Sequence, residues 1–334
     1  MHFARSRVTT LTPRCGRWAP ALAGLALLVA CSTSSVAVQA PLAPPAETST
    51  ATATQTTTLP ATDPSGEVRL VSSGLERAYT LHVPAVGTGP RPLVVALHGR
   101  FQTRAKIAAY TGFAGVADAR GFVVAFPGAV GGGWNAGTCC STGSARQIDD
   151  VGFLDDLISD VAGRTSVDLR RVYVVGFSNG GMLAYRYGCQ RSGRVAGVAV
   201  VAGAMTADAS FARPAPPACR PSGPVALLHV HGTADPLSAA GGYQRSLGTT
   251  TTSAATSVAA YVRAAGCTGS VLQRVGQASK RVHGGCRTSS GRGVTYVSIR
   301  GLGHQWTRTG TGYDTTRGIV DALFANSSPV PAGR

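Results

Sequence analysis

The chain has 334 residues, of which 44% are hydrophobic, and its formal net charge at pH 7 is +16. This hydrophobic content is enough to bury a sizeable core, which excludes a chain that is disordered throughout. The positive charge does not indicate a nucleic-acid partner, because the arginines are scattered and no basic run is interleaved with aromatic residues. We therefore expect no nucleic-acid binding.

The N-terminal segment has the pattern of a secretory signal. Arginines precede an apolar run over residues 18–30, which is too short to span a bilayer comfortably. The run ends in LVAC, with Cys31 last, and this resembles a bacterial lipobox, in which the cysteine is diacylated. We predict a signal peptide over residues 1–30, a lipid anchor on Cys31 and an extracellular or cell-envelope location on the outer face of a bacterial membrane. The alternative is ordinary cleavage near Ala40, which would discard Cys31.

Residues 31–65 are rich in Ser, Thr, Ala and Pro and contain almost no large apolar side chains. Such a segment cannot bury enough surface to offset its ordering entropy, so we predict a disordered tether. The folded catalytic domain is predicted over residues 66–326, a normal size for an α/β enzyme, with a C-terminal tail over 327–334. No other apolar run is long enough for a transmembrane helix, so the lipid anchor is the expected membrane attachment.

Within the predicted domain, short apolar segments alternate with segments of helical character. Residues 67–70 and 79–83 predict an opening antiparallel pair of strands. The later strands are apolar throughout, as strands covered on both faces must be, and are expected at 93–97, 123–126, 172–175, 195–201, 225–230 and 294–299. Helices are expected at 103–120, 149–164, 180–189, 253–265 and 315–325. This alternation predicts an α/β fold with a mostly parallel central sheet and helices on both faces.

The hexapeptide GFSNGG, residues 176–181, follows one of these strands directly and opens the next helix. Its first five residues satisfy G-x-S-x-G, the pattern of a nucleophile elbow, with Ser178 at its centre. A strand that turns so sharply into a helix leaves no room for flanking Cβ atoms, which accounts for the glycines. Ser178 is therefore the candidate nucleophile, at the carboxyl end of the sheet.

A serine nucleophile needs a histidine to remove its proton and an acid to orient that histidine. With a nucleophile elbow, the chain order is serine, acid, histidine. Asp235 follows the strand at 225–230 and His304 follows the last strand, so these residues are the candidate acid and base. Aspartate before proline is also a common turn residue, and Asp208 and Asp314 are the alternative acids.

An oxyanion hole needs backbone N–H groups aimed at the substrate carbonyl oxygen. Asn179, directly after the candidate nucleophile, is expected to provide one of them. The turn after the strand at 93–97 is expected to provide the other, for which Arg100 is favoured and Phe101 is the alternative.

Two tryptophans are candidates for the substrate pocket, and two acids call for a different interpretation. Trp134 and Trp306 can offer stacking surfaces for an acyl group or a sugar, with burial in the core as the alternative for Trp134. Asp149 and Asp150 lie at a predicted helix N-terminus, where capping and the helix dipole favour acids, so a structural role is predicted. No phosphate loop, metal cluster or dinucleotide fingerprint is present in the sequence, and we expect neither a cofactor nor a metal.

Outside the signal and the lipobox, the chain has an even number of cysteines, which predicts three disulfides in an oxidising compartment. Cys267 and Cys286 are expected to pair and close a loop of about twenty residues. Adjacent cysteines pair with each other only at the cost of backbone strain, so each member of the 139–140 pair is expected to reach a separate partner. The four residues concerned are Cys139, Cys140, Cys189 and Cys219. Neither CxxC spacing nor paired histidines support zinc as the rival explanation.

Six sequence blocks together carry a family resemblance that covers about residues 68–324. They read LVVALHGR, GGGWNAGTCC, DDVGFLDDLI, RVYVVGFSNGGM, LHVHGTADP and GLGHQW. This combination resembles the secreted α/β-hydrolases of the poly(3-hydroxybutyrate) depolymerase and feruloyl esterase group, and is similar to carbohydrate esterase family 1. The resemblance implies an α/β-hydrolase fold with Ser178 as nucleophile, Asp235 as acid and His304 as base.

The sequence departs from this group in two ways. The group often continues the last block as H-x-W-P-G, whereas Trp306 is followed here by Thr307 and Arg308, which changes the expected shape of that side of the cleft. We find no appended substrate-binding module of the kind that extracellular polymer depolymerases carry. Crystalline polyester is therefore a weaker expectation than a soluble substrate.

These observations predict a secreted, monomeric serine esterase that hydrolyses carboxylic esters through an acyl-enzyme. The expected substrates are feruloyl or acetyl esters of polysaccharides, or short hydroxyalkanoate oligomers. Two alternatives remain at this point. One is a non-catalytic envelope lipoprotein that binds glycan or lipid on the same fold, and the other is a peptidase.

Overall fold

The computed structural model describes residues 64–85, 89–137, 147–206, 223–237, 251–287 and 293–324. All of them belong to one compact unit, Leu59–Arg334. The predicted signal peptide, the predicted lipidation site Cys31, nearly all of the predicted tether and the predicted C-terminal tail lie outside the described residues. Those assignments therefore stay predictions.

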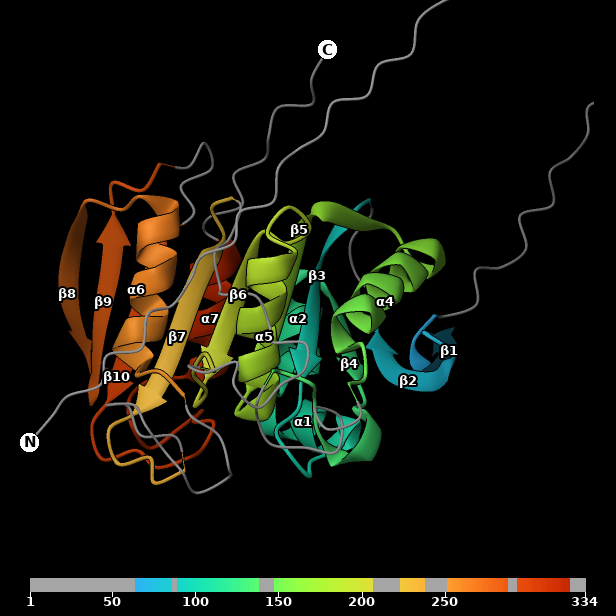
Figure 1. Cartoon of the computed structure of the whole chain (residues 1–334), viewed down its shortest axis with the longest axis horizontal. Helices are drawn as coiled ribbons and strands as arrows, with labels where there is room; N and C mark the ends of the chain where they lie inside the picture. The colour runs from blue at the N-terminus through green and yellow to red at the C-terminus, as the bar shows by residue number, and fades with distance from the viewer. Residues whose placement is uncertain are drawn as a thin grey trace, which may run out of the picture. The chain divides into compact units, whose positions relative to one another are not determined.

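The described residues form one ten-stranded sheet in the order β1-β2-β4-β3-β5-β6-β7-β10-β9-β8 (Figure 1). The strands are β1 (Gly66–Ser72), β2 (Leu75–His82), β3 (Arg91–Leu97), β4 (Val123–Pro127), β5 (Val167–Phe177), β6 (Gly197–Val201), β7 (Ala226–Gly232), β8 (Gly269–Val275), β9 (Ala278–Gly284) and β10 (Val294–Ile299). The central strands, from β4 to β10 in that order, are all parallel. The pairs at both edges are antiparallel. The predicted mostly parallel α/β sheet is confirmed.

Helices cover both faces of this sheet (Figure 1). They are α1 (Arg104–Thr111), α2 (Phe113–Arg120), α4 (Asp150–Arg164), α5 (Asn179–Gln190), α6 (Ala254–Ala265) and α7 (Thr315–Phe324), with a 3₁₀ turn, η1, at Val130–Gly132. Apolar residues of α4, α5 and α6 join one core cluster, and those of α1, α2 and α7 join another. Successive residues of β3 alternate between the clusters, because side chains point to opposite faces along a strand. The central strands are apolar throughout for this reason.

The single helix expected at 103–120 is two helices in the structure. Gly112 adopts a left-handed conformation with φ of 63°, and its N–H donates to the carbonyl oxygen of Ala108 to close α1. The next helix, α2, begins at once with Phe113. Glycine favours this left-handed cap because it has no Cβ, and the cap turns the chain between two short helices.

The sequence prediction also missed the hairpin of β8 and β9. Every residue of β8 is exposed, so the segment has no buried face that would produce an apolar alternation in the sequence. The hairpin extends the sheet at one edge, beside β10 (Figure 1). It is therefore a strand pair held by backbone hydrogen bonds with little burial.

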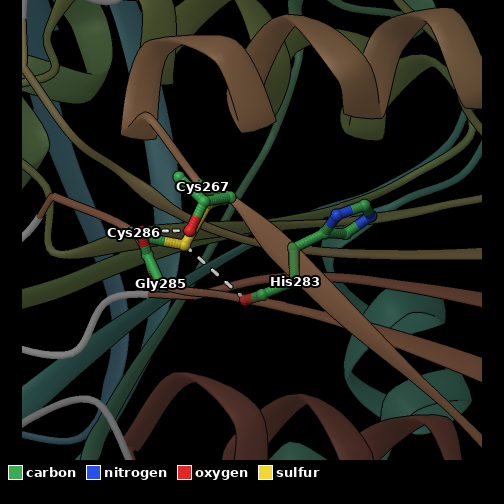
Figure 2. Close-up of a disulfide and its surroundings, with 5 residues drawn as sticks. Cys267, His283, Gly285 and Cys286 are labelled. Atoms are coloured by element: carbon green, nitrogen blue, oxygen red, sulfur yellow. Dashed lines mark hydrogen bonds between the residues drawn. A yellow bond between two sulfur atoms is a disulfide. The ribbon is translucent and has the colours of Figure 1, made fainter.

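A disulfide closes this hairpin at its base. Cys267, just after α6, bonds to Cys286, just after β9, with an S–S distance of 2.04 Å (Figure 2). The predicted pair is confirmed, and the loop that it encloses is the β8–β9 hairpin. Cys189 is also disulfide-bonded, and its partner lies outside the described residues, as do Cys139, Cys140 and Cys219. The connectivity predicted for those four cysteines stays a prediction.

None of the helices in the described part of the chain is long and apolar enough to span a bilayer.

Candidate active site

Ser178 lies in a tight turn between β5, which ends at Phe177, and α5, which begins at Asn179. Its backbone has φ of 53° and ψ of −119°, a region that non-glycine residues rarely adopt. A Cβ atom on Gly176 would lie 2.1 Å from the carbonyl oxygen of Gly180, and one on Gly180 would lie 2.5 Å from that of Leu97. The elbow inferred from the sequence, and the steric reason for its glycines, are both confirmed.

Three polar side chains from separate segments meet at this turn. His304 Nε2 lies 2.9 Å from Ser178 Oγ, and His304 Nδ1 lies 2.9 Å from Asp235 Oδ2. Asp235 follows β7 and His304 follows β10. Because β5, β7 and β10 run parallel, their carboxyl ends lie at the same edge of the sheet. The structure thus brings together the three side chains that the sequence analysis selected.

Asp314, one of the two alternative acids, does not contribute to this cluster. Asp314 lies at the start of α7, where its Oδ1 accepts a hydrogen bond from the N–H of Arg317. Asp208 lies outside the described residues. The side chain of Asp235 is wholly buried, and its Oδ1 also accepts a hydrogen bond of 2.9 Å from the N–H of Leu237. Asp235 therefore holds the turn after β7 and contacts His304 at the same time.

The loop after β3 lies beside the elbow. Leu97 is the register partner of Gly176, and a Cβ atom on Gly99 would lie 3.0 Å from the ring of Phe177. The side chain of Gln102 holds this loop by accepting a hydrogen bond of 3.0 Å from the N–H of Gly99. The loop is thus fixed against the residue that precedes Ser178.

Within the described part of the chain, neither the backbone N–H of Arg100 nor that of Asn179 donates to a partner. The N–H of Phe101 instead donates to the carbonyl oxygen of Gly132 at 2.6 Å. The alternative of Phe101 as an oxyanion donor is therefore wrong, because its proton is already bound. The N–H groups of Arg100 and Asn179 remain the candidate donors.

Trp134 connects the loop after β3 to the elbow. Its Nε1–H donates to the carbonyl oxygen of His98 at 2.8 Å, and its backbone N–H donates to Asn179 Oδ1 at 2.7 Å. The Nδ2 group of Asn179 donates back to the carbonyl oxygen of Trp134 at 3.2 Å. Trp134 is wholly buried, so the expectation that it lines the substrate pocket is wrong. Its hydrogen bonds instead set the spacing between the two candidate oxyanion donors.

Trp306 is also a core residue, with 5% of its surface exposed. Its Nε1–H donates to Thr316 Oγ1 at 2.9 Å, and its ring packs edge-on against Phe113. The expectation of a pocket role is wrong here too, because α2 and α7 cover the ring.

His98 is buried beneath the candidate oxyanion loop in its neutral form. Its Nδ1–H donates to the carbonyl oxygen of Gly99 at 2.7 Å, and its Nε2 accepts from the N–H of Ala129 at 3.1 Å. Nε2 can accept only when it carries no proton. Burial lowers the pKa of His98, which agrees with this hydrogen-bond pattern.

The two acids at the start of α4 have the structural role that was predicted. Asp149 caps the helix by accepting from the N–H of Gly152, and Asp150 forms a buried ion pair of 2.7 Å with Arg77. Burial raises the pKa of Asp150, and the charge of Arg77 opposes that shift. Asp150 also accepts a hydrogen bond from the N–H of Asn135, next to Trp134. The ion pair of Asp150 with Arg77 therefore anchors the segment through which Trp134 joins the loop after β3 to the elbow.

Within the described ranges, no three His, Cys, Asp or Glu side chains are grouped in a way that could hold a metal ion.

Comparison with known proteins identifies the family. No family model matches the chain. A curated protein, "Putative esterase NocK" from Nocardia uniformis subsp. tsuyamanensis, is 33% identical over 315 residues, which cover 85% of this chain and 88% of that protein. The chain belongs to this family of esterases. It is a carboxylic ester hydrolase.

Two further relatives of this esterase match over a shorter stretch. "Bifunctional acetylxylan esterase/xylanase XynS20E" from Neocallimastix patriciarum is 30% identical over 162 residues, which cover 48% of this chain and 22% of that protein. "Feruloyl esterase B" from Piromyces equi is 32% identical over 119 residues, which cover 34% of this chain and 20% of that protein. The matched part of this esterase therefore spans about a fifth of the length of either relative.

Solved structures agree with the fold. "Acetyl xylan esterase from Aspergillus awamori" superposes with a TM-score of 0.56 at 12% identity, covering 78% of this chain and 99% of that one. "Crystal Structure of sOPH Native" superposes with a TM-score of 0.52 at 19% identity, covering 74% of this chain and 83% of that one. The esterase has the α/β-hydrolase fold.

The sequence analysis considered Phe101 only as a backbone donor and missed its exposed ring. Phe101 is 74% exposed, and the guanidinium carbon of Arg100 lies 4.4 Å from the centre of its ring. Leu237, two residues after Asp235, is 50% exposed. The sequence does hold a signal for this exposed ring. Phe101 lies in the turn after the apolar strand at 93–97, and a residue in such a turn does not belong to the buried strand. Phe101 thus replaces the two tryptophans as the candidate aromatic surface of the site.

Proposed function

We propose that this esterase hydrolyses carboxylic esters through Ser178, His304 and Asp235 by way of an acyl-enzyme. The observation that carries the proposal is the continuous pair of contacts, 2.9 Å each, from Ser178 Oγ through His304 to Asp235. The strained elbow supports it, because such strain persists where the surrounding structure enforces a functional geometry.

In the first half of the reaction, His304 Nε2 takes the proton of Ser178 as Oγ attacks the ester carbonyl carbon. The N–H groups of Arg100 and Asn179 would stabilise the resulting oxyanion, each contributing about 3 kcal/mol to the transition state. The C–O bond to the alcohol then breaks, and His304 donates its proton to the leaving oxygen. Asp235 accepts the Nδ1–H of His304 throughout and stabilises the imidazolium.

In the second half, a water molecule replaces the alcohol. His304 takes a proton from this water, the hydroxide attacks the acyl carbon, and Ser178 leaves with the proton that His304 returns. The products are the free acid and the unmodified enzyme.

The proposed substrates are acetyl or feruloyl esters of polysaccharides, with short hydroxyalkanoate oligomers as the second choice. The names of the relatives support acetylxylan and feruloyl esters. The exposed ring of Phe101 next to the candidate oxyanion loop supports an aromatic acyl group or a sugar, since both stack on such a surface.

We also propose that the esterase works outside the cytoplasm, as a lipoprotein anchored through Cys31. The disulfides at Cys267–Cys286 and Cys189 support an oxidising compartment. Expression of the full chain in a bacterial host tests the anchor. The wild type should partition into the detergent phase of Triton X-114, and the Cys31→Ala variant should move to the aqueous phase. Wild-type protein in the aqueous phase would contradict lipidation.

Ser178→Ala tests the reaction. We expect kcat for p-nitrophenyl acetate to fall by at least about 10⁴-fold, with an unchanged unfolding midpoint. Ser159→Ala, at an exposed position of α4, is the matched control and should retain full activity. A fluorophosphonate probe should add to Ser178 of the wild type. If the folded wild type stayed unlabelled, a glycan- or lipid-binding role would replace the proposal.

A further inference from the structure

A chain of buried polar side chains continues behind Asp235, on the side away from Ser178. His231 Nε2 lies 3.4 Å from Asp235 Oδ2, and His231 Nδ1 lies 3.0 Å from His229 Nε2. The hydroxyl of Tyr185 lies 2.6 Å from His229 Nδ1. The contacts already described therefore extend without a break from Ser178 to a tyrosine on α5.

These three residues lie deep in the protein. His229 and His231 are alternate residues of β7 and so point to the same face of the sheet, where α5 covers them. Tyr185, His229 and His231 are each no more than 1% exposed. Burial lowers the pKa of His229 and raises the pKa of Tyr185, so both stay neutral over the working pH range. Leucine or phenylalanine would fill this volume without polar atoms to satisfy, so the polar chain needs an explanation.

The carboxylate of Asp235, 3.4 Å from His231 Nε2, fixes the direction of the hydrogen bonds from His231 through His229 to Tyr185. An ionised carboxylate only accepts, so His231 turns Nε2–H toward it. In that tautomer, His231 Nδ1 accepts from Nε2–H of His229. His229 Nδ1 in turn accepts from the hydroxyl of Tyr185. All donors on this side point toward Asp235, as His304 Nδ1–H does from the other side.

Among the described residues, the groups that pack around these side chains are uncharged tyrosines and a serine. Tyr296 of β10 packs its ring 5.5 Å from that of His229, and the ring of Tyr261 of α6 lies 5.5 Å from that of Tyr185. The hydroxyl of Tyr261 donates to the backbone carbonyl of Tyr185, outside the chain of side chains. Burial raises the pKa of Tyr261 and of Tyr296. Ser298 is the register partner of His231 on β10 and is uncharged. Asp235 is thus the charged group at which the chain ends.

We propose that His231 is a positioning residue that donates a second imidazole hydrogen bond to Asp235, and that His229 and Tyr185 hold it in the donating tautomer. The proposal rests on the Ser178–His304–Asp235 mechanism proposed for this esterase. The role of His231 is to stabilise the buried carboxylate of Asp235 and to keep Oδ2 of Asp235 aimed at His304.

The row of hydrogen-bonded side chains behind Asp235 should control the pH at which the enzyme becomes active. Asp235 and His304 together carry one negative charge when His304 is neutral, and none after the pair takes up a proton. A donor on Asp235 favours the more negative state. Loss of that donor makes the pair take up its proton at a higher pH, whichever residue holds it. The acid limb of the kcat/KM profile should then move to higher pH.

His231→Leu and His231→Gln test the donor role. His231→Leu should move the midpoint of the acid limb of kcat/KM for p-nitrophenyl acetate upward by about 0.5 to 1 pH unit. His231→Gln keeps an N–H donor in reach of Asp235, so its midpoint should stay within about 0.2 pH unit of the wild type. A loss of thermal stability in His231→Leu with an unmoved acid limb would make the chain merely structural. An equal shift in both variants would rule out the donor.

Tyr185→Phe and Tyr261→Phe form a matched pair at the far end of the chain. Each removes one buried hydroxyl, but only Tyr185 donates to His229. Tyr185→Phe should move the acid limb in the same direction as His231→Leu by a smaller amount, and Tyr261→Phe should leave it in place. This pair decides the question if His231→Leu does not fold. Equal midpoints in the two variants would overturn the proposal.

Fluorophosphonate labelling separates this proposal from the one on which it rests. Absence of an adduct on Ser178 of the wild type would remove the mechanism itself. An adduct on Ser178 together with an acid limb that none of the variants moves would remove only the role of His231.

Discussion

The two sides of β10 are stabilised in different ways. Toward β7, the loops at the carboxyl ends of the strands are fixed by buried hydrogen bonds, such as that from Trp134 Nε1–H to the carbonyl oxygen of His98. Away from β7, the β8–β9 hairpin has a fully exposed outer strand and is closed by the Cys267–Cys286 disulfide. Polar groups can hold a loop strongly where water is excluded, whereas an exposed strand pair gains little from burial and benefits from a covalent bond. The predictions that follow test this contrast.

The largest effect is expected from removing the side chain that joins the loop and the elbow. Trp134→Ala should lower the free energy of unfolding by about 3 to 5 kcal/mol, because it leaves a cavity and unpaired polar groups in the core. Urea denaturation measures this change. Val271→Ala, on the exposed face of β8, is the control and should change the stability by less than about 0.5 kcal/mol. Equal effects at the two positions would refute the contrast.

The next effect is that of the disulfide. Replacing Cys267 and Cys286 together by serine should lower the free energy of unfolding by about 3 kcal/mol, because the unfolded chain regains the freedom of a 19-residue loop. The value of kcat should not change, because the hairpin provides none of the residues of the proposed site. Substitution is preferable to a reductant, which would also reach the disulfide of Cys189. A parallel loss of kcat would mean that the hairpin supports the site.

A smaller effect concerns pH. Burial holds the pKa of His98 low in the folded state, so the unfolded chain takes up more protons as the pH falls below about 6.5. Stability should therefore be retained above that pH and be lost progressively below it. His98→Asn should make this loss shallower between pH 7 and pH 5, as followed by the thermal unfolding midpoint. His283→Asn, in the half-buried β9, should change the slope less. An unchanged slope in His98→Asn would contradict the neutral assignment.

The smallest effect is expected at the surface of the site. Phe101→Ala should raise KM for methyl ferulate about five-fold, because stacking on an exposed ring contributes about 1 kcal/mol. The kinetic constants for p-nitrophenyl acetate should hardly change. Leu272→Ala, an exposed apolar position of the hairpin, is the control and should affect neither substrate. A similar rise of KM for both esters would mean that Phe101 shapes the loop and does not contact the acyl group.

Much of the candidate site follows from local patterns. The glycines around Ser178 report a strand that turns at once into a helix, and the close approach of Gly176 to Gly180 shows the steric cause. Asp235 and His304 could be chosen because each follows an apolar segment that is buried on both faces. The β8–β9 hairpin could not be found in this way, since an exposed strand leaves no apolar alternation.

The positions of the aromatic residues could not be predicted by the same reasoning. An aromatic residue near a candidate catalytic segment is equally compatible with a pocket and with the core. Trp134 and Trp306 lie in the core because helices and loops from distant parts of the chain cover them, and Phe101 lies outside because η1 binds its backbone but leaves its ring exposed.

The sequence by itself determined the strands and helices along the chain apart from the β8–β9 hairpin and the break between α1 and α2. It also pointed to the elbow at Ser178 and to Asp235 and His304 as its candidate partners. These features depend on local sterics and on periodicity, which neighbouring residues encode. The tertiary structure alone decided which N–H groups remain available at the elbow, which aromatic ring faces solvent, and that His231, His229 and Tyr185 continue the chain behind Asp235. Those properties depend on contacts between β7, α5 and loops far apart in the sequence, where the direction of a side chain is set by packing.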